Sequence, residues 1–348
     1  AIYTVTEQYI KPVTLKAGRV SWALMRHPRG LQCDLFVTHA WQEGIFEFVD
    51  KVLCSWPNGA RHAWCCMLAN PQNEDISQLL QDPALSPFAK ALEVSPRMLV
   101  VPNRKGSIYT RLWCAYEAFL AYQWDKVILT AAGPASSRIL RALPLVLLLV
   151  GAGLAAGFWA NIGHLGDLSP IFDFSLYPLL VVSLVGTRVN LRRACNLFGA
   201  IWAACYFGIL CQLPSKHEFD NLWMEFQFRF SAASIAFFVL SEVDRVRFAI
   251  SLEEAEELTR GCSGSIRDAR CSSATDDARI RAEIEDCVEM VDHTIAVLVR
   301  AGVSTANLRE AVDFGVDIEG FAYAGVAFCA FLLGSAVPIG GIDGLEVL

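Results

Sequence analysis

Long apolar blocks alternate with short charged segments through the second half of the chain. The first block follows Arg141 and continues to about Ala160, roughly 19 residues without a charge, which is enough to cross the hydrocarbon core of a bilayer. Further apolar blocks lie at residues 171–187, 194–213, 222–241 and 321–339. We therefore expect an integral membrane protein with a helical bundle of about five spans, the first four within 139–241 and the fifth within 320–348.

The fourth block is less apolar than the others. Glu225 and Arg229 lie in its first half, and a charge near the bilayer centre costs roughly 2.5–3.5 kcal/mol on insertion scales. A buried or interfacial helix is therefore the alternative for this block. The blocks contain no central histidine and few ionisable groups, which favours an anchor or an assembly surface over a transporter or proton relay. Small residues at 151–157 and 199–204 would let helices approach closely.

Arginines gather in alternate segments between the blocks. They precede the first block, separate the second from the third and follow the fourth, at Arg138, Arg141, Arg188, Arg192, Arg193, Arg245 and Arg247. The positive-inside rule then places the N-terminal domain and the segment 242–319 on the cytoplasmic-equivalent face. The pattern leaves open which membrane holds the protein.

The N-terminal part shows a different pattern, in which short apolar runs alternate with helical spacing. Strand-length runs lie at 35–37, 63–69, 97–102 and 126–130, and helical patterns follow Gly44 and cover 108–122. Prolines and a glycine predict an irregular segment over 1–32, and the polar stretch 70–96 is expected to be a long loop with one or two helical turns. Strand–helix alternation predicts a flavodoxin-like α/β domain with a parallel sheet over 33–135.

Polar and aromatic residues follow the first predicted strand directly. Thr38, His39 and Trp41 would lie at the carboxyl edge of the sheet, where open α/β folds bind ligands. A helix over 108–122 would add Trp113, Cys114 and Glu117 within about one turn of one another.

These residues resemble a known family. The segment 33–41 is similar to the first box of Toll/interleukin-1 receptor (TIR) domains, and Arg111-Leu-Trp-Cys-Ala-Tyr-Glu117 resembles the TIR segment in which Glu follows a Trp-Cys pair by three residues. A group of TIR-like membrane proteins in algae and protists is more similar still. It shares, in the same order, the stretches 36–41, 64–73 and 86–90 and the Trp-Cys segment. The resemblance covers about 33–130.

The resemblance implies two activities. Many TIR domains are scaffolds that self-associate, whereas others cleave NAD at the nicotinamide–ribose bond with the carboxylate that Glu117 would supply. Thr38, His39, Trp41 and Trp113 would then line the NAD pocket. The chain departs from the family because it enters the first apolar block soon after its fourth strand, without the last helix and strand of a complete TIR domain.

Each of these residues also has a purely structural interpretation. Glu117 could orient Arg111 or a backbone amide, Trp113 and Cys114 could belong to the core, and His39 could be a hydrogen-bonded histidine at a strand end.

Composition narrows the classes of function further. Hydrophobic residues make up 54% of the chain, and the net charge of −7 argues against nucleic-acid binding. The twelve cysteines include no C-x-x-C pair, so we expect neither a metal site nor a redox-active dithiol. No cofactor is predicted, and NAD enters only as a substrate of the enzyme alternative.

The segment 242–319 contains a second soluble part. A charged helix at 251–258 and a loop at 261–275 precede an apolar stripe at three- and four-residue spacing, formed by Ile280, Ile284, Val288, Val291, Ile295 and Leu298. We expect a helix over 276–300 to dock this stripe onto the N-terminal domain, and a short helix to follow Ser304.

Two functions are therefore open. The first is a TIR-like interaction protein, in signalling or as an accessory subunit of a membrane complex, whose partners are other membrane subunits or copies of itself. The alternative is a membrane-bound NAD glycohydrolase that uses Glu117.

The arginine pattern generates a test of topology. We predict that residues 1–138 and 242–319 lie on one side of the membrane and Leu348 on the other. Protease digestion of sealed vesicles checks this arrangement. Protection of the N-terminal domain together with cleavage at Lys216 and within 242–319 would contradict it.

Overall fold

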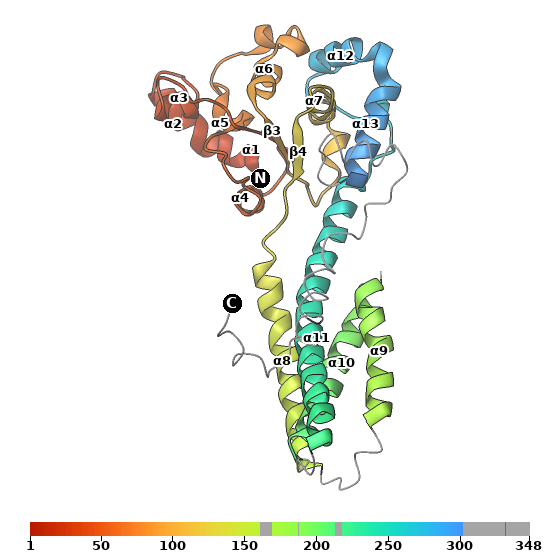
Figure 1. Ribbon diagram of the computed structural model, residues 1–348. Helices are drawn as coiled ribbons and strands as arrows, with labels where there is room; N and C mark the ends of the chain where they lie inside the picture. Colours follow the sequence, from red (N-terminus) through yellow and green to blue (C-terminus); the bar gives the residue numbers. More distant parts are fainter. Residues whose placement is uncertain (161–168, 187, 213–217, 302–330, 332–348) are drawn as a thin grey trace, which may run out of the picture. The chain divides into compact units, whose positions relative to one another are not determined.

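The computed structural model describes residues 1–160, 169–186, 188–212, 218–301 and 331. The chain divides into two compact units (Figure 1). The α/β unit comprises Ala1–Pro134 and Ser251–Glu319, and the helical unit comprises Ala135–Ile250 and Gly320–Leu348.

A four-stranded sheet forms the centre of the α/β unit. Its strands are β1 (Leu35–Thr38), β2 (Ala63–Cys65), β3 (Arg97–Val100) and β4 (Val127–Thr130), in the order β2-β1-β3-β4. Every neighbouring pair is parallel. The predicted parallel sheet is therefore confirmed, and its order is compatible with a flavodoxin-like fold. Successive connections leave β1 and β3 in opposite directions, which creates a switch point between these two strands.

Helices cover both faces of this sheet. Leu35 and Val37 of β1 point to the face covered by α4 (Ile45–Cys54) and α1 (Ile2–Val5), where Phe48 and Ile2 complete one apolar cluster. Phe36 points to the opposite face, which is covered by α6 (Pro87–Val94) and α7 (Leu112–Gln123). This alternation follows from the two-residue period of a strand that is buried on both sides.

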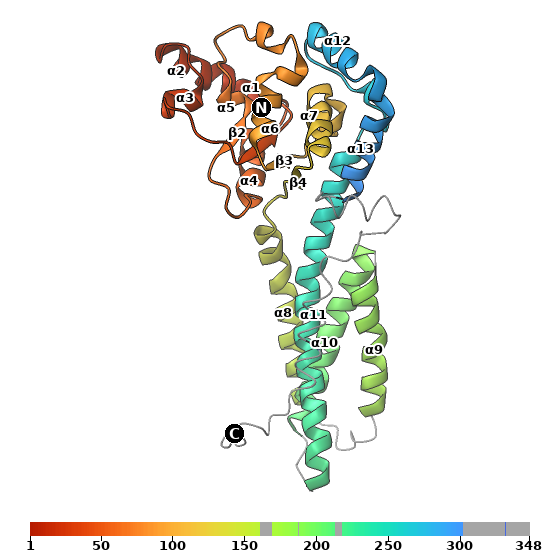
Figure 2. The same ribbon diagram turned by 45° about the horizontal axis from the view of Figure 1, so that its top comes forward.

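The segment after residue 273 packs on the outer side of α7, as the apolar stripe predicts. Its elements are α12 (Ala274–Glu283), the 3-10 turn η7 (Glu285–Cys287) and α13 (Val288–Ala301), and Figures 1 and 2 both show α12 and α13 beside α7. Ile284, Val291 and Ile295 are buried in the same cluster as α7. The predicted single helix is interrupted at Ile284, whose backbone leaves the helical region. The helix expected after Ser304 lies outside the described residues.

The N-terminal segment, predicted to be irregular, is largely helical. It contains α1, a π-helical turn η1 (Thr6–Ile10), α2 (Lys11–Lys16) and α3 (Trp22–Arg26). Pro12 is accommodated in the first turn of α2, directly after the π turn, where a missing N–H is tolerated. Four buried residues at four-residue spacing hold the segment in place: Ile2, Thr6, Ile10 and Thr14. Two of these four residues are threonines, so the apolar pattern in the sequence is too weak to predict a helix.

Three further elements differ in the structure from their predicted form. The second strand stops at Cys65, and a helical turn α5 (Cys66–Ala69) follows it. The expected loop 70–96 holds the 3-10 turns η2 (Ser77–Leu80) and η3 (Pro83–Leu85) before α6. The helix over 108–122 is divided into the 3-10 turn η4 (Ile108–Thr110) and α7.

The helical unit contains α8 (Ser136–Trp159), α9 (Ser169–Val185), α10 (Val189–Leu210) and most of α11 (Glu218–Thr259), a single helix of 42 residues that ends in the α/β unit. Within the described residues, two helices, α8 and α10, are long and apolar enough to cross a membrane. The third predicted span corresponds to α10, whereas α9 carries a shorter apolar stretch, Phe174–Leu184. The fifth predicted span lies outside the described residues, so five spans stay a prediction.

Glycines bring α8 and α10 into close contact, as the small residues predict. A Cβ atom added to Gly153 or Gly157 would overlap backbone atoms of Ile201 or Cys205 in α10. On α10, a Cβ atom on Gly199 would overlap the ring of Phe238. Contacts this close allow backbones to pack without side chains between them.

Buried charges link α10 and α11 within the helical unit. Arg192 donates to Asp244 at 2.8 Å, Asn196 donates to Glu242 at 3.2 Å, and Arg245 donates to Glu242 at 2.7 Å. Arg192 and Arg245 both contribute to the predicted topology, but in the structure they are paired inside the unit. The orientation stays a prediction.

The contact of α13 with α7 generates a test of stability. We predict that Val291→Asp lowers the free energy of unfolding of the α/β unit by about 3 kcal/mol or more, because it places an unpaired carboxylate at a fully buried position. Hydrogen exchange in α7 measures the effect. Met290→Asp adds the same charge at a neighbouring position that is 47% exposed and should leave exchange nearly unchanged. Equal exchange in the two variants would show that the stripe does not stabilise α7.

Candidate functional site

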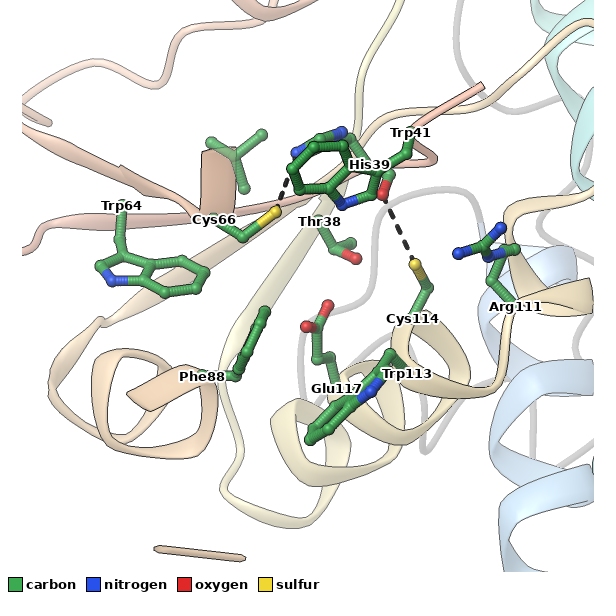
Figure 3. A pocket seen from close by; sticks show the side chains of 11 residues that line it. Thr38, His39, Trp41, Trp64, Cys66, Phe88, Arg111, Trp113, Cys114 and Glu117 are labelled. Carbon is green, nitrogen blue, oxygen red and sulfur yellow. Dashed lines mark hydrogen bonds between the residues drawn. The ribbon is translucent and has the colours of Figure 1, made fainter. Parts of the chain in front are cut away.

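A pocket of about 80 Å³ lies at the carboxyl end of β1, beside the first turns of α7 (Figure 3). The structure brings all five predicted site residues together in this pocket: Thr38, His39, Trp41, Trp113 and Glu117. The remaining lining residues are Val37, Trp64, Cys66, Phe88, Arg111 and Cys114.

Backbone hydrogen bonds fix the two elements that carry these side chains. The carbonyl of Thr38 accepts from Val101 N at 3.0 Å, which holds the end of β1 against the chain after β3. At the start of α7, Leu112 N donates to Arg270 O at 3.0 Å and Arg270 N donates to Thr110 O at 2.8 Å. Trp113, Cys114 and Glu117 then face the pocket because residues three and four apart share one side of a helix.

Glu117 is buried, and its carboxyl group points toward Thr38 (Figure 3). Burial raises the pKa of Glu117 to about 8, and the Thr38 hydroxyl offsets this only in part. Within the described part of the chain, Glu117 forms no ion pair. Arg111 instead donates to Ser272 Oγ at 2.8 Å, which argues against the interpretation that Glu117 orients Arg111.

His39 and the cysteines around it are uncharged at neutral pH. The pKa of His39 is lowered to about 4, mainly by burial; the backbone of Ala40 opposes this shift, and the nearby Arg111 contributes to it. Nε2 of His39 lies 3.2 Å from Cys66 Sγ, and Cys114 Sγ donates to the carbonyl of His39 at 3.6 Å. Burial raises the pKa of the Cys66 thiol well above its usual range. This His–Cys pair therefore lacks the thiolate that a nucleophilic cysteine needs.

Aromatic rings form the other walls of the pocket. Phe88 stacks on Trp113 with ring centroids 5.0 Å apart, and it meets Trp64 edge-on at 5.2 Å. Trp113 therefore serves both the core around α7 and the pocket wall. Cys66, Trp64 and Phe88 also line the pocket, although no pattern in the sequence predicted them as site residues. The predicted second strand continued to residue 69 and so placed Cys66 in its interior, whereas in the structure β2 ends at Cys65 and Cys66 lies at the carboxyl edge of the sheet.

The size of the pocket limits what it can bind. Sites for drug-sized ligands measure about 300–1,000 Å³, so a pocket of about 80 Å³ admits a group of about one ring, and a larger ligand must extend out of it. Aromatic faces and a carboxyl group that can ionise both favour a cation. Among the described residues, no three or more His, Cys, Asp or Glu side chains are grouped so that they could hold a metal ion.

Comparisons with known proteins leave the family open. No protein-family model matches the chain, and neither a curated protein nor a solved structure matches it.

The burial of Glu117 generates a test of pH dependence. The ordinary pKa of this group is 4.5, so between about pH 4.5 and 8 the folded unit keeps a proton that the unfolded chain has released. The contribution of Glu117 to the free energy of unfolding should therefore fall as pH rises through this range, by up to about 1.4 kcal/mol per pH unit, and level off above it. Denaturant unfolding of the α/β unit at several pH values measures this slope.

Substitutions separate the contribution of Glu117 to this slope from the contributions of other titratable groups. Glu43 is also buried and its pKa is raised to about 8, so it contributes a slope of the same sign, whereas the lowered pKa of His39 contributes a slope of the opposite sign below about pH 6.5. Glu117→Gln should make the slope shallower without abolishing it, whereas Glu93→Gln changes an exposed residue and should leave the slope intact. An unchanged slope in Glu117→Gln would mean that Glu117 is already ionised at low pH.

Proposed function

We propose that this protein is a membrane-anchored hydrolase whose α/β unit cleaves the nicotinamide–ribose bond of NAD at Glu117. The observation that supports the proposal most is that Glu117 is a buried carboxyl group in an aromatic-lined pocket at the carboxyl end of β1, and that no described residue forms an ion pair with it. A carboxyl group with a purely structural role is normally paired or hydrogen-bonded to charged donors. A strongly shifted pKa at a pocket is instead typical of a functional group.

The charge of the substrate fits the electrostatics of the pocket. The nicotinamide ring of NAD is a cation, and a cation near Glu117 favours the ionised carboxylate. Substrate binding therefore releases the proton that Glu117 holds in the empty pocket at neutral pH. The tryptophan faces around the pocket stabilise the same positive charge.

The proposed reaction follows the general scheme of glycoside cleavage. The bond between the ribose C1′ and the ring nitrogen breaks, and its electron pair neutralises the ring, which leaves as nicotinamide. The positive charge then spreads over C1′ and the ring oxygen of ribose, where the Glu117 carboxylate stabilises it. Water adds at C1′ and loses a proton, which completes the hydrolysis.

Two observations support the membrane anchor. Both α8 and α10 are long and apolar enough to cross a membrane, and only 11% of the most apolar stretch of α8 is buried. The linker between β4, which ends at Thr130, and α8, which begins at Ser136, is five residues long. We also propose that the chain crosses the membrane several times and that the α/β unit lies on the cytoplasmic-equivalent face.

A scaffold is the second candidate, and the surface of α4 favours it. Phe46, Val49 and Leu53 are 84%, 40% and 65% exposed, and they share one side of this helix. Adjacent exposed apolar residues of this kind often mark a contact with another protein. The partner would be a second copy of the chain or another subunit of a membrane complex, in signalling or assembly.

The release of nicotinamide tests the enzyme proposal. Purified protein is incubated with NAD, and nicotinamide is separated and quantified over time. We expect Glu117→Gln to lower the rate at least a hundredfold, because the amide cannot carry the charge that stabilises the transition state. Glu93→Gln, an exposed change on α6, should leave the rate unchanged.

The outcome separates the two candidates. Equal background rates in wild type and Glu117→Gln would exclude hydrolysis at this pocket. Self-association that is lost in Phe46→Asp and kept in Glu93→Gln would then support the scaffold.

A further inference from the structure

A second group of buried charges lies outside the pocket of Glu117. Nζ of Lys51, in α4, donates to Glu257 Oε2 at 2.8 Å and to the carbonyl of Pro102 at 2.7 Å. The Glu47 carboxylate lies 3.2 Å from the same nitrogen. Arg104 reaches both acids, at 3.0 Å from Glu47 and 3.7 Å from Glu257. We call these four side chains the Lys51 cluster.

The Lys51 cluster lies at the switch point of the sheet. Its members come from α4, which follows β1, from the loop that follows β3, and from the last turns of α11. Open α/β sheets bind their ligands in the crevice at this position. In this protein Glu257, which is 206 residues away from Lys51 in sequence, brings the last turn of α11 to this position through its contact with Lys51.

Several hydrogen bonds hold the end of α11 in this crevice. Ser107 N donates to the carbonyl of Arg260 at 2.7 Å, and Arg260 donates to the carbonyl of Arg104 at 2.6 Å. After β4, Gly133 N donates to Glu254 at 3.1 Å. The segments that follow β3 and β4 therefore contact the last turns of α11 and the residue after it, Arg260.

The exposure of the two cations differs in a way that suits a binding site. The Lys51 side chain is 5% exposed, so its charge needs close anionic partners. The Arg104 side chain is 65% exposed, so it forms the side of the cluster that is open to solvent. An anion that arrives from solvent meets Arg104 first and reaches Lys51 only if Glu257 moves.

We propose that Lys51 and Arg104 form a binding site for a phosphate-type oxyanion, and that the Glu257 carboxylate occupies this site as an internal substitute. A lysine ammonium has three donors, and the one that Glu257 uses becomes available to a phosphate oxygen once Glu257 leaves. Arginine suits the same ligand because its planar group binds phosphate in a bidentate manner. Binding of the anion releases the last turns of α11 from the crevice.

The local charge balance permits this exchange. Once Glu257 leaves, Lys51 and Arg104 face Glu47 as the one remaining ionised partner within the cluster. The neighbouring Glu43 is 1% exposed, and neither of its carboxyl oxygens has a hydrogen-bond partner among the residues that the structure describes. Burial raises the pKa of Glu43 to about 8, so it adds little negative charge at neutral pH.

Calorimetric titration of the 348-residue protein tests the site. Inorganic phosphate, pyrophosphate and AMP are titrated separately, so that a free anion and a nucleotide phosphate are distinguished. We expect Glu257→Gln to bind pyrophosphate at least tenfold more tightly than wild type, because its site is no longer occupied by a carboxylate. Adding Lys51→Met to this variant should abolish the gain. Glu256→Gln is the matched control, since that side chain is 70% exposed and pairs with Arg260 at the surface.

A second measurement keeps the test decisive if Glu257→Gln folds poorly. Saturating pyrophosphate should increase hydrogen exchange in 251–260 of the wild-type protein, because the anion displaces Glu257. Equal pyrophosphate affinity in Glu257→Gln and wild type, or unchanged exchange at saturation, would show that Glu257 and Lys51 form only a structural ion pair. Neither measurement depends on NAD cleavage, so this result is independent of Glu117.

Discussion

The burial of α7 on both of its sides is the constraint on which the α/β unit depends. Nine of its twelve residues are buried, because the sheet covers one side and α12 and α13 cover the other. A helix that is apolar around its whole circumference is stable only when it is enclosed in this way. The residues after 273 are therefore as necessary to the unit as the strands, although more than 140 residues separate them from α7.

Enclosure of α7 also determines the chemistry of the pocket. Glu117 and Cys114 lie on this helix, and the low polarity around them keeps both groups protonated at neutral pH. The Lys51 cluster, at the same edge of the sheet, contains charged groups instead of neutral ones. Close pairing with opposite charges stabilises them despite their burial. A buried charge without a partner is expensive, so each ionisable group is either neutral or paired. The two sites consequently favour ligands of opposite charge.

The sequence predicts local patterns well and distant pairing poorly. Apolar runs of strand length identify all four strands, and the stripe that includes Val291 predicts the docking of α13. The predicted site residues also meet, because residues at the ends of parallel strands share one edge. The Lys51–Glu257 pair was missed because no pattern along the chain links residues that far apart. The N-terminal helices were missed because threonines interrupt their apolar stripe.

Charged residues within α10 and α11 illustrate the same limit. From the sequence alone, we expect Arg192 and Arg245 to be free positive charges that flank apolar blocks, and Glu242 to begin a soluble segment. In the structure, α11 continues past this point without a break, and Asp244 and Glu242 pair with the two arginines. An arginine that is neutralised by a buried acid contributes less to a positive-inside bias than a free one does. Counts of charge along a chain therefore describe topology reliably only where the charges face solvent, and that depends on partners that the local sequence does not show.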